Sequence, residues 1–145
     1  MKRVSIYLVA LTLVGLAILH SAKGQASAPF PTYVVAKAAF VGQTGNLPAT
    51  TVYTPLVTGD YRLSMYVDQP TYQGSYPCVY WTWTDDFSAQ INATGACTGG
   101  GSTSVFGSND VFVRALAGQP IQITSQGSAS GPFNVYVTVE QVGLH

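Results

Sequence analysis

The chain has 145 residues, one domain's worth, and only 8% of them are charged. Six Lys and Arg residues balance six Asp and Glu residues over the whole chain. Without the first 26 residues, three cationic residues remain against six acidic ones, a net charge of −3. Proteins that bind nucleic acid need a basic surface for the phosphate backbone, so this composition argues against that class.

The N-terminus has the pattern of a secretory signal peptide. Lys2 and Arg3 form a basic start, the mostly apolar run Val4–Leu19 follows, and small residues lie around the expected cleavage point. The apolar run is shorter than the roughly 20 residues that a membrane-spanning helix needs, which disfavours an uncleaved anchor. We therefore expect a cleaved leader at 1–26 and a single domain at 27–145 with no membrane span. The protein would then be secreted or extracellular, or periplasmic or on the cell surface.

Apolar and polar residues alternate along most of the mature chain, the period that predicts β-strands with one buried face. The clearest strand is Gly59–Gln69, which Pro55 and Pro70 bound on either side. The predicted strands are Tyr33–Val41, Ala49–Thr54, Gly59–Gln69, Cys78–Thr84, Phe87–Ala93, Thr103–Phe106, Val111–Leu116, Ile121–Ser125 and Pro132–Val142.

The residue patterns of two of these strands predict contrasting surroundings. Tyr33–Val41 has apolar residues on both faces, so we expect it to be covered on both sides. The last strand should bury Phe133, Val135, Val137 and Val139 on one face and expose the residues between them. No helical period interrupts the mature chain. Eight or nine short strands separated by turn signals predict an all-β fold, an antiparallel two-sheet β-sandwich that is large enough for a jelly roll.

Both cysteines, Cys78 and Cys97, lie in the mature region. In an exported protein, such a pair predicts a structural disulfide, and closing a loop of about 20 residues should stabilise the fold by about 3 kcal/mol. The alternatives are weaker. Redox pairs are more often spaced as Cys-x-x-Cys, and two thiols without a nearby histidine make a poor zinc site.

Three segments share a pattern of strands and turns with a known family. Val52–Val67 combines a proline, a turn glycine, an aromatic residue and an alternating strand. Within Val111–Ile123, the stretch Leu116–Ile121 is similar to that family's hairpin before its penultimate strand, with Gln119 in place of the usual acidic residue. Phe133–Val139 matches the closing strand. The chain thus resembles the jelly roll of the C1q and tumour-necrosis-factor-like superfamily.

This resemblance implies a compact homotrimer. Tyr66 and Tyr136 project from the faces opposite the core residues of their strands, as Tyr53 or Phe40 would in one register. Outward-facing aromatic residues are typical of interface cores, so Tyr66 and Tyr136 are the candidate oligomer interface. Alternatively, they are partly covered surface tyrosines, which a β-sandwich tolerates.

The mature chain shows no catalytic pattern. Its single histidine, His145, stands at the very C-terminus, where a side chain makes a poor general base. Asp60 and Asp68 are about 27 Å apart at roughly 3.4 Å per residue, too far to cooperate in glycoside hydrolysis. We therefore expect a protein that is not an enzyme and has no cofactor.

Asp85 and Asp86 are adjacent acids at a predicted corner of the chain. Turn geometry accounts for both of them without a ligand. They are also weak candidates for binding Ca²⁺ together with loop carbonyls, as extracellular modules do. No other metal site is predicted.

Aromatic residues cluster in the loop 70–78 and the strand after it, and exposed rings can stack on the apolar faces of sugars. The residues concerned are Tyr72, Tyr76, Tyr80, Trp81 and Trp83. Both tryptophans alternate in phase with Val79, so we expect them in the core near the disulfide. The three tyrosines remain as candidates for ligand binding.

Two hypotheses for function follow. The first is a secreted, non-catalytic and oligomeric structural or adhesive surface module. The second is a carbohydrate-binding module that uses the loop 70–78. Asn92-Ala93-Thr94 also fits the N-glycosylation acceptor, which matters only in a host that performs this modification.

Overall fold

A computed structural model describes residues 32–71, 77–98, 105–127 and 131–144. All of the regular structure in these ranges is β-strand, as predicted, and none of it is a helix that could cross a membrane. The predicted leader lies outside the described residues. The strands are β1 (Tyr33–Gln43), β2 (Thr50–Tyr53), β3 (Gly59–Gln69), β4 (Cys78–Thr84), β5 (Gln90–Cys97), β6 (Val105–Ala115), β7 (Ile121–Gln126) and β8 (Phe133–Leu144).

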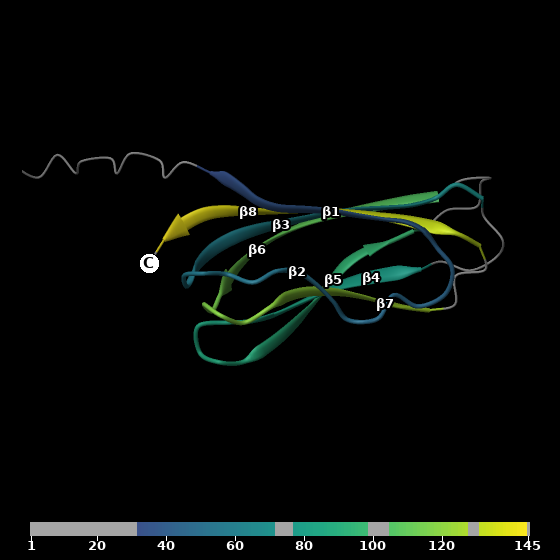
Figure 1. Ribbon diagram of the computed structural model, residues 1–145. Helices are drawn as coiled ribbons and strands as arrows, with labels where there is room; N and C mark the ends of the chain where they lie inside the picture. The colour runs from purple at the N-terminus through teal and green to yellow at the C-terminus, as the bar shows by residue number, and fades with distance from the viewer. Residues whose placement is uncertain (1–31, 72–76, 99–104, 128–130, 145) are drawn as a thin grey trace, which may run out of the picture. The chain divides into compact units, whose positions relative to one another are not determined.

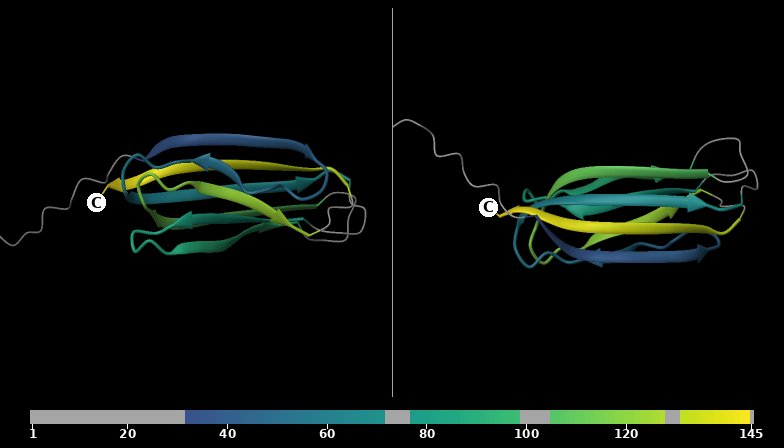
Figure 2. Two further views of the ribbon diagram at one scale, coloured as in Figure 1. Left: turned by 60° about the horizontal axis from the view of Figure 1, so that its bottom comes forward. Right: turned by 90° about the horizontal axis from the view of Figure 1, so that it is seen from above.

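The strands form two sheets that pack face to face (Figures 1 and 2). One sheet has the order β1-β8-β3-β6, and we call it sheet A. The other has the order β2-β7-β4-β5, and we call it sheet B. Every pairing is antiparallel, and the chain crosses repeatedly between the sheets. Eight strands with this Greek-key order are a jelly roll, so the predicted fold class is confirmed.

The core lies between the two inner faces. On β3, every second residue from Gly59 to Gln69 is buried, because β3 is a central strand of sheet A. The predicted inward residues of β8 are also buried, and Trp81 and Trp83 fill the core from sheet B, as predicted. Burial of each large apolar side chain contributes about 1.5–3 kcal/mol. The alternation in the sequence thus supplies both halves of the core.

Tyr61 brings a polar group into this core. Its side chain is fully buried, and its hydroxyl donates a hydrogen bond to the carbonyl oxygen of Val57 at 3.0 Å. Burial raises the pKa of the Tyr61 phenol, and the neighbouring Tyr53, with ring centroids 6.0 Å apart, raises it further. The hydroxyl therefore stays protonated where it is needed as a donor.

The start of the fifth strand differs from the prediction. The sequence predicts a strand at Phe87–Ala93, but β5 begins at Gln90 and continues past the predicted end. The Asp85 carboxylate accepts hydrogen bonds from the backbone N–H of Phe87 at 3.0 Å and of Ala89 at 2.9 Å. These amides therefore belong to a turn, because the Asp85 side chain competes for them.

The prediction of two strands at Thr103–Phe106 and Val111–Leu116 is also wrong. Within the described residues, the chain forms one continuous strand, β6, that pairs with the whole length of β3. Pairing with a long central strand carries the chain through the polar stretch that separates the two predicted strands. A Cβ at Gly107 would collide with the carbonyl of Cys97, so this glycine lets β6 of sheet A approach β5 of sheet B.

The first strand is not covered on both sides, contrary to the prediction. β1 is the edge strand of sheet A, and its inner residues, such as Ala38 and Phe40, pack against the core. On the outer face of the same strand, Val34 and Val41 are 51% and 63% exposed. A strand that is apolar on both faces thus has one of these faces in contact with solvent.

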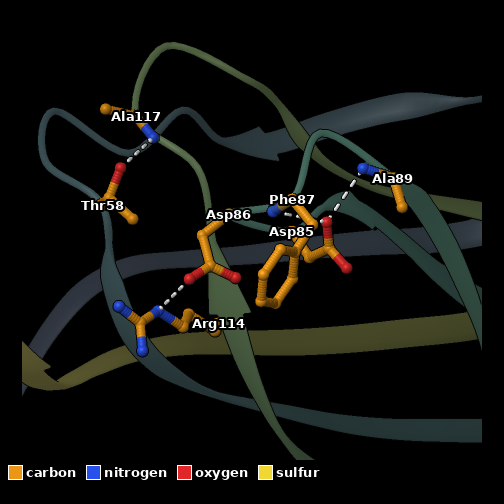
Figure 3. Close-up of polar contacts among 7 residues, drawn as sticks. All are labelled: Thr58, Asp85, Asp86, Phe87, Ala89, Arg114 and Ala117. Carbon is orange, nitrogen blue, oxygen red and sulfur yellow. Dashed lines mark hydrogen bonds and ion pairs between the residues drawn. The ribbon is translucent and has the colours of Figure 1, made fainter.

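Three loops meet at one end of the sandwich (Figure 3). Thr58 Oγ1 accepts a hydrogen bond from the backbone N–H of Ala117 at 3.1 Å, and Arg114 pairs with Asp86 at 2.7 Å. Leu116 N–H also donates to the carbonyl of Thr84 at 2.9 Å. The Leu116–Ile121 stretch therefore links sheet A to sheet B, whereas the sequence resemblance suggests a hairpin.

Candidate interaction surface

Tyr66 and Tyr136 lie next to each other in the middle of the outer face of sheet A. They are cross-strand partners on β3 and β8, with ring centroids 6.1 Å apart and ring planes inclined by 35°. Their exposed fractions are 41% and 40%. Ala39 of β1 and Ser108 of β6 extend the same row on either side. The small neighbours leave the two rings as the most prominent side chains of the row.

Polar pairs on either side of the rings hold this face in a defined conformation. Arg62 and Glu140 form an ion pair at 2.6 Å across β3 and β8. Asn134 donates a hydrogen bond to Asp68 at 2.6 Å and accepts one from the backbone N–H of Gly42 at 2.9 Å. Each partly exposed ion pair contributes little stability, up to about 1 kcal/mol, so its main effect is to fix side-chain positions.

Most of the large exposed apolar side chains belong to this sheet. Of the nine found among the described residues, six lie on its strands, and none lies on a strand of sheet B. The six are Tyr33, Val34, Val41, Tyr66, Phe112 and Tyr136. All of them except Tyr33, whose register partner Gln141 belongs to the inner face, lie on the outer face of the sheet. An apolar surface concentrated on one face marks an interaction site.

The two edges of sheet A carry opposite charges in one row. Lys37 on β1 is aligned with Thr138 of β8, which is aligned with Ser64 of β3 and then with Asp110 of β6. The cation and the anion therefore lie at the same height on opposite edges. If copies of the sheet stood edge to edge, head to tail, Lys37 of one would face Asp110 of the next.

The predicted disulfide is confirmed. Cys78 and Cys97 are bonded, with an S–S distance of 2.05 Å, and they are direct partners on β4 and β5. The bond therefore joins the edge strand of sheet B to its neighbour. No cysteine is left free.

The weak metal candidates have other partners. The Asp85 carboxylate accepts the two backbone N–H groups of its own turn, and Asp86 is paired with Arg114 (Figure 3). Across the described ranges, no three His, Cys, Asp or Glu side chains are grouped so that they could hold a metal ion. The geometry is that of a turn and an ion pair.

Of the three tyrosines proposed for ligand binding, Tyr72 and Tyr76 lie outside the described residues. Tyr80 lies on the outer face of sheet B and lines a depression of about 350 Å³. The other lining residues are Asn92, Ala93, Thr124 and Gln126. Sequence reasoning missed Thr124 and Gln126 as site residues. The signal was present in the alternation of β7, which places both on the face opposite Ile121 and Ile123.

The fold has counterparts among solved structures. The globular domain of zebrafish complement 1qA is similar to this chain with a TM-score of 0.52 and 14% identity, over 79% of this chain and 96% of that one. The Eiger TNF of S. frugiperda has a TM-score of 0.44 and 12% identity, over 81% and 96% of the two chains. A pentameric capsid protein from metagenomic phage sequences has a TM-score of 0.44 and 17% identity, over 87% and 73%.

No protein-family model and no curated protein matches the sequence. At 14% identity, the likeness to the complement domain extends to the fold alone. The chain therefore has a jelly-roll β-sandwich fold similar to that of the complement domain.

Proposed function

We propose that this protein is a secreted, non-catalytic interaction module that self-associates through the outer face of sheet A. The observation that carries the proposal is the tyrosine pair, Tyr66 and Tyr136, at the centre of a face that exposes further apolar side chains along β1 and β6. Aromatic residues enriched at the centre of a patch, with charged residues towards its rim, are typical of protein–protein interfaces.

The charges at the edges of this face support a closed ring of copies. In a ring of copies whose outer faces of sheet A point towards the common axis, Tyr66 and Tyr136 face that axis and the β1 edge of each copy stands next to the β6 edge of the following copy. Such heterologous contacts close into rings when the rotation allows it. Lys37 then meets Asp110 across each contact, as their shared row requires. We propose a homotrimer, which is the assembly that the family resemblance implies.

Three features support an extracellular location. The leader at 1–26 has the sequence of a signal peptide. The Cys78–Cys97 disulfide suits an oxidising compartment, and the domain at 27–145 carries few charged residues. In that setting, the assembled ring would act as a structural or adhesive surface module without enzymatic activity.

Light scattering of the mature chain tests the assembly. We expect three times the mass of one chain, and we expect Tyr66→Ser combined with Tyr136→Ser to give a monomer of unchanged fold by circular dichroism. The matched control is Leu56→Ser, which removes an 86% exposed apolar side chain from the loop between β2 and β3. A monomeric wild-type chain at high concentration would contradict the proposal, and so would an assembly that the tyrosine double variant leaves intact.

A further inference from the structure

The outer face of sheet B has a different chemistry from that of sheet A. The four strands β2, β7, β4 and β5 contain no Asp, Glu, Lys or Arg at any position. Their outward positions carry hydroxyl and amide groups instead, apart from the Cys78–Cys97 disulfide at one end of the face. The side chains that share this face are Thr51, Tyr80, Thr82, Thr84, Gln90, Asn92, Gln122, Thr124 and Gln126.

Register aligns these polar groups in a row that crosses all four strands. Thr51, Gln122, Thr82 and Asn92 are successive partners on β2, β7, β4 and β5. The Gln122 amide donates a hydrogen bond to the Thr51 hydroxyl at 3.2 Å, and the Thr82 hydroxyl donates to the Asn92 side-chain oxygen at 2.8 Å. These bonds hold the side chains in place before any ligand arrives.

Beside this row lies the depression lined by Tyr80. In the next row of the sheet, Tyr80 is the partner of Thr124 on one side and of Thr94 on the other. Asn92 and Gln126 reach the depression from β5 and β7, and its volume is about 350 Å³. This is the lower end of the range of about 300–1,000 Å³ for small-molecule sites.

The lining groups define what fits. Asn and Gln side chains each offer both donors and an acceptor, and a Thr hydroxyl offers one of each, which matches the alternating hydroxyl groups of a sugar. The half-buried Tyr80 adds one aromatic ring on which the apolar face of a pyranose can pack. A charged ligand would find no opposite charge on these strands, and a single ring is too little for a lipid or an apolar peptide.

From this combination we propose that the outer face of sheet B binds a neutral oligosaccharide, with its central sugar unit in the depression between Tyr80, Asn92, Thr124 and Gln126. The ligand class is that of the second sequence hypothesis, but the site is the sheet face rather than the loop 70–78. The site is independent of the proposed assembly, because it lies on the other sheet. Assembly would still place several copies of it on one particle and strengthen binding by avidity.

Isothermal titration of the mature chain with neutral hexasaccharides tests the site. The probes are cellohexaose, xylohexaose and mannohexaose, with hexagalacturonate as the charged counterpart. The protein should be produced in a host without N-glycosylation, since a glycan on Asn92 would cover the face. We expect at least one neutral probe to bind with a dissociation constant of about 1 mM or below, as for weak binding by few contacts.

Variants separate the site from the rest of the molecule. Tyr80→Ala and Gln126→Ala should each weaken binding about tenfold, equivalent to about 1.4 kcal/mol, and Tyr80→Phe should retain it. Phe87→Ala, which removes an 87% exposed ring in the turn between β4 and β5, is the matched control and should leave binding unchanged. Backbone amide NMR shifts of the wild type with the bound probe should change on β4, β5 and β7.

Four results would overturn the inference. The first is that none of the neutral probes binds. The second is that hexagalacturonate binds as well as they do. The third is that binding persists unchanged in both Tyr80→Ala and Gln126→Ala. The fourth is that the NMR shifts map to sheet A. None of these results bears on self-association, which is read from the mass alone.

Discussion

The two sheets share one pattern inside and differ outside. Both present alternating apolar residues to a common core, such as Leu63 and Val137 from sheet A and Trp81 and Ile123 from sheet B. On their outer faces, sheet A carries several exposed large apolar side chains and seven charged residues, whereas sheet B carries no charged residue and, as its large aromatic ring, the half-buried Tyr80. Because folding constrains only the inner face, the outer faces are where two different surfaces can arise from the same strand pattern.

This difference separates two kinds of partner. Exposed apolar side chains with paired charges, such as Arg62 with Glu140, suit a protein surface that excludes water. Hydroxyl and amide groups with a single ring, Tyr80, suit a hydrated polar ligand. Self-association and sugar binding should therefore respond to different substitutions.

The largest effect should come from removing the Cys78–Cys97 disulfide, which belongs to sheet B. Replacing both cysteines, as Cys78→Ser with Cys97→Ser, removes the constraint on a loop of about 20 residues and should lower the free energy of unfolding by about 3 kcal/mol. The measurement is urea unfolding followed by tryptophan fluorescence, since Trp81 and Trp83 lie on β4, which carries Cys78 of the disulfide.

Hydrogen exchange then shows whether the loss is local. Amides of β4 and β5 should lose more protection than those of β3 and β8, because β5 is the edge strand that the disulfide holds. An equal loss of amide protection in both sheets would mean that the disulfide stabilises the whole sandwich. The difference between the two sheets would then not include a difference in local stability.

A smaller effect is expected from reversing one edge charge of sheet A. Lys37→Glu should weaken self-association several-fold, because two acids would then meet at each contact, and Asp110→Lys in the same chain should restore it. Sedimentation at two salt concentrations measures both variants, and the defect should shrink at high salt. Oligosaccharide binding should not change in either. Failure of the double variant to recover would argue that the β1 and β6 edges do not meet.

The smallest effect concerns the buried phenol of the shared core. Tyr61→Phe removes the hydrogen bond to the Val57 carbonyl and should lower the free energy of unfolding by about 1 kcal/mol near neutral pH. The raised pKa of Tyr61 means that the folded chain keeps this proton when the unfolded chain loses it. Stability from this group is thus complete below about pH 10 and is lost as the pH rises further.

Urea unfolding at a series of pH values tests this sign. The advantage of the wild type over Tyr61→Phe should shrink above about pH 10. Tyr33→Phe, at a 59% exposed position, is the matched control. An advantage that grows with pH would contradict the role of burial in raising the pKa.

The fold class and most of the core follow from the residue pattern alone. Period-two alternation locates β3 and β4 to the residue, and it identifies the inward side chains of β8, because a strand with one buried face must repeat every two residues. The cysteine pair and the burial of both tryptophans follow from the same local reasoning. The outward position of Tyr66 and Tyr136 does too.

Which strands are neighbours depends on how the whole chain packs, and the two outer surfaces depend on this strand order. β1 is apolar on both faces, yet its place at an edge leaves one of them exposed. Pairing with β3 made β6 one strand, and the Asp85 side chain delayed the start of β5. Asn92, Thr124 and Gln126 come together with Tyr80 because β7 and β5 flank β4, and such contacts between distant segments depend on strand order, which local sequence does not encode.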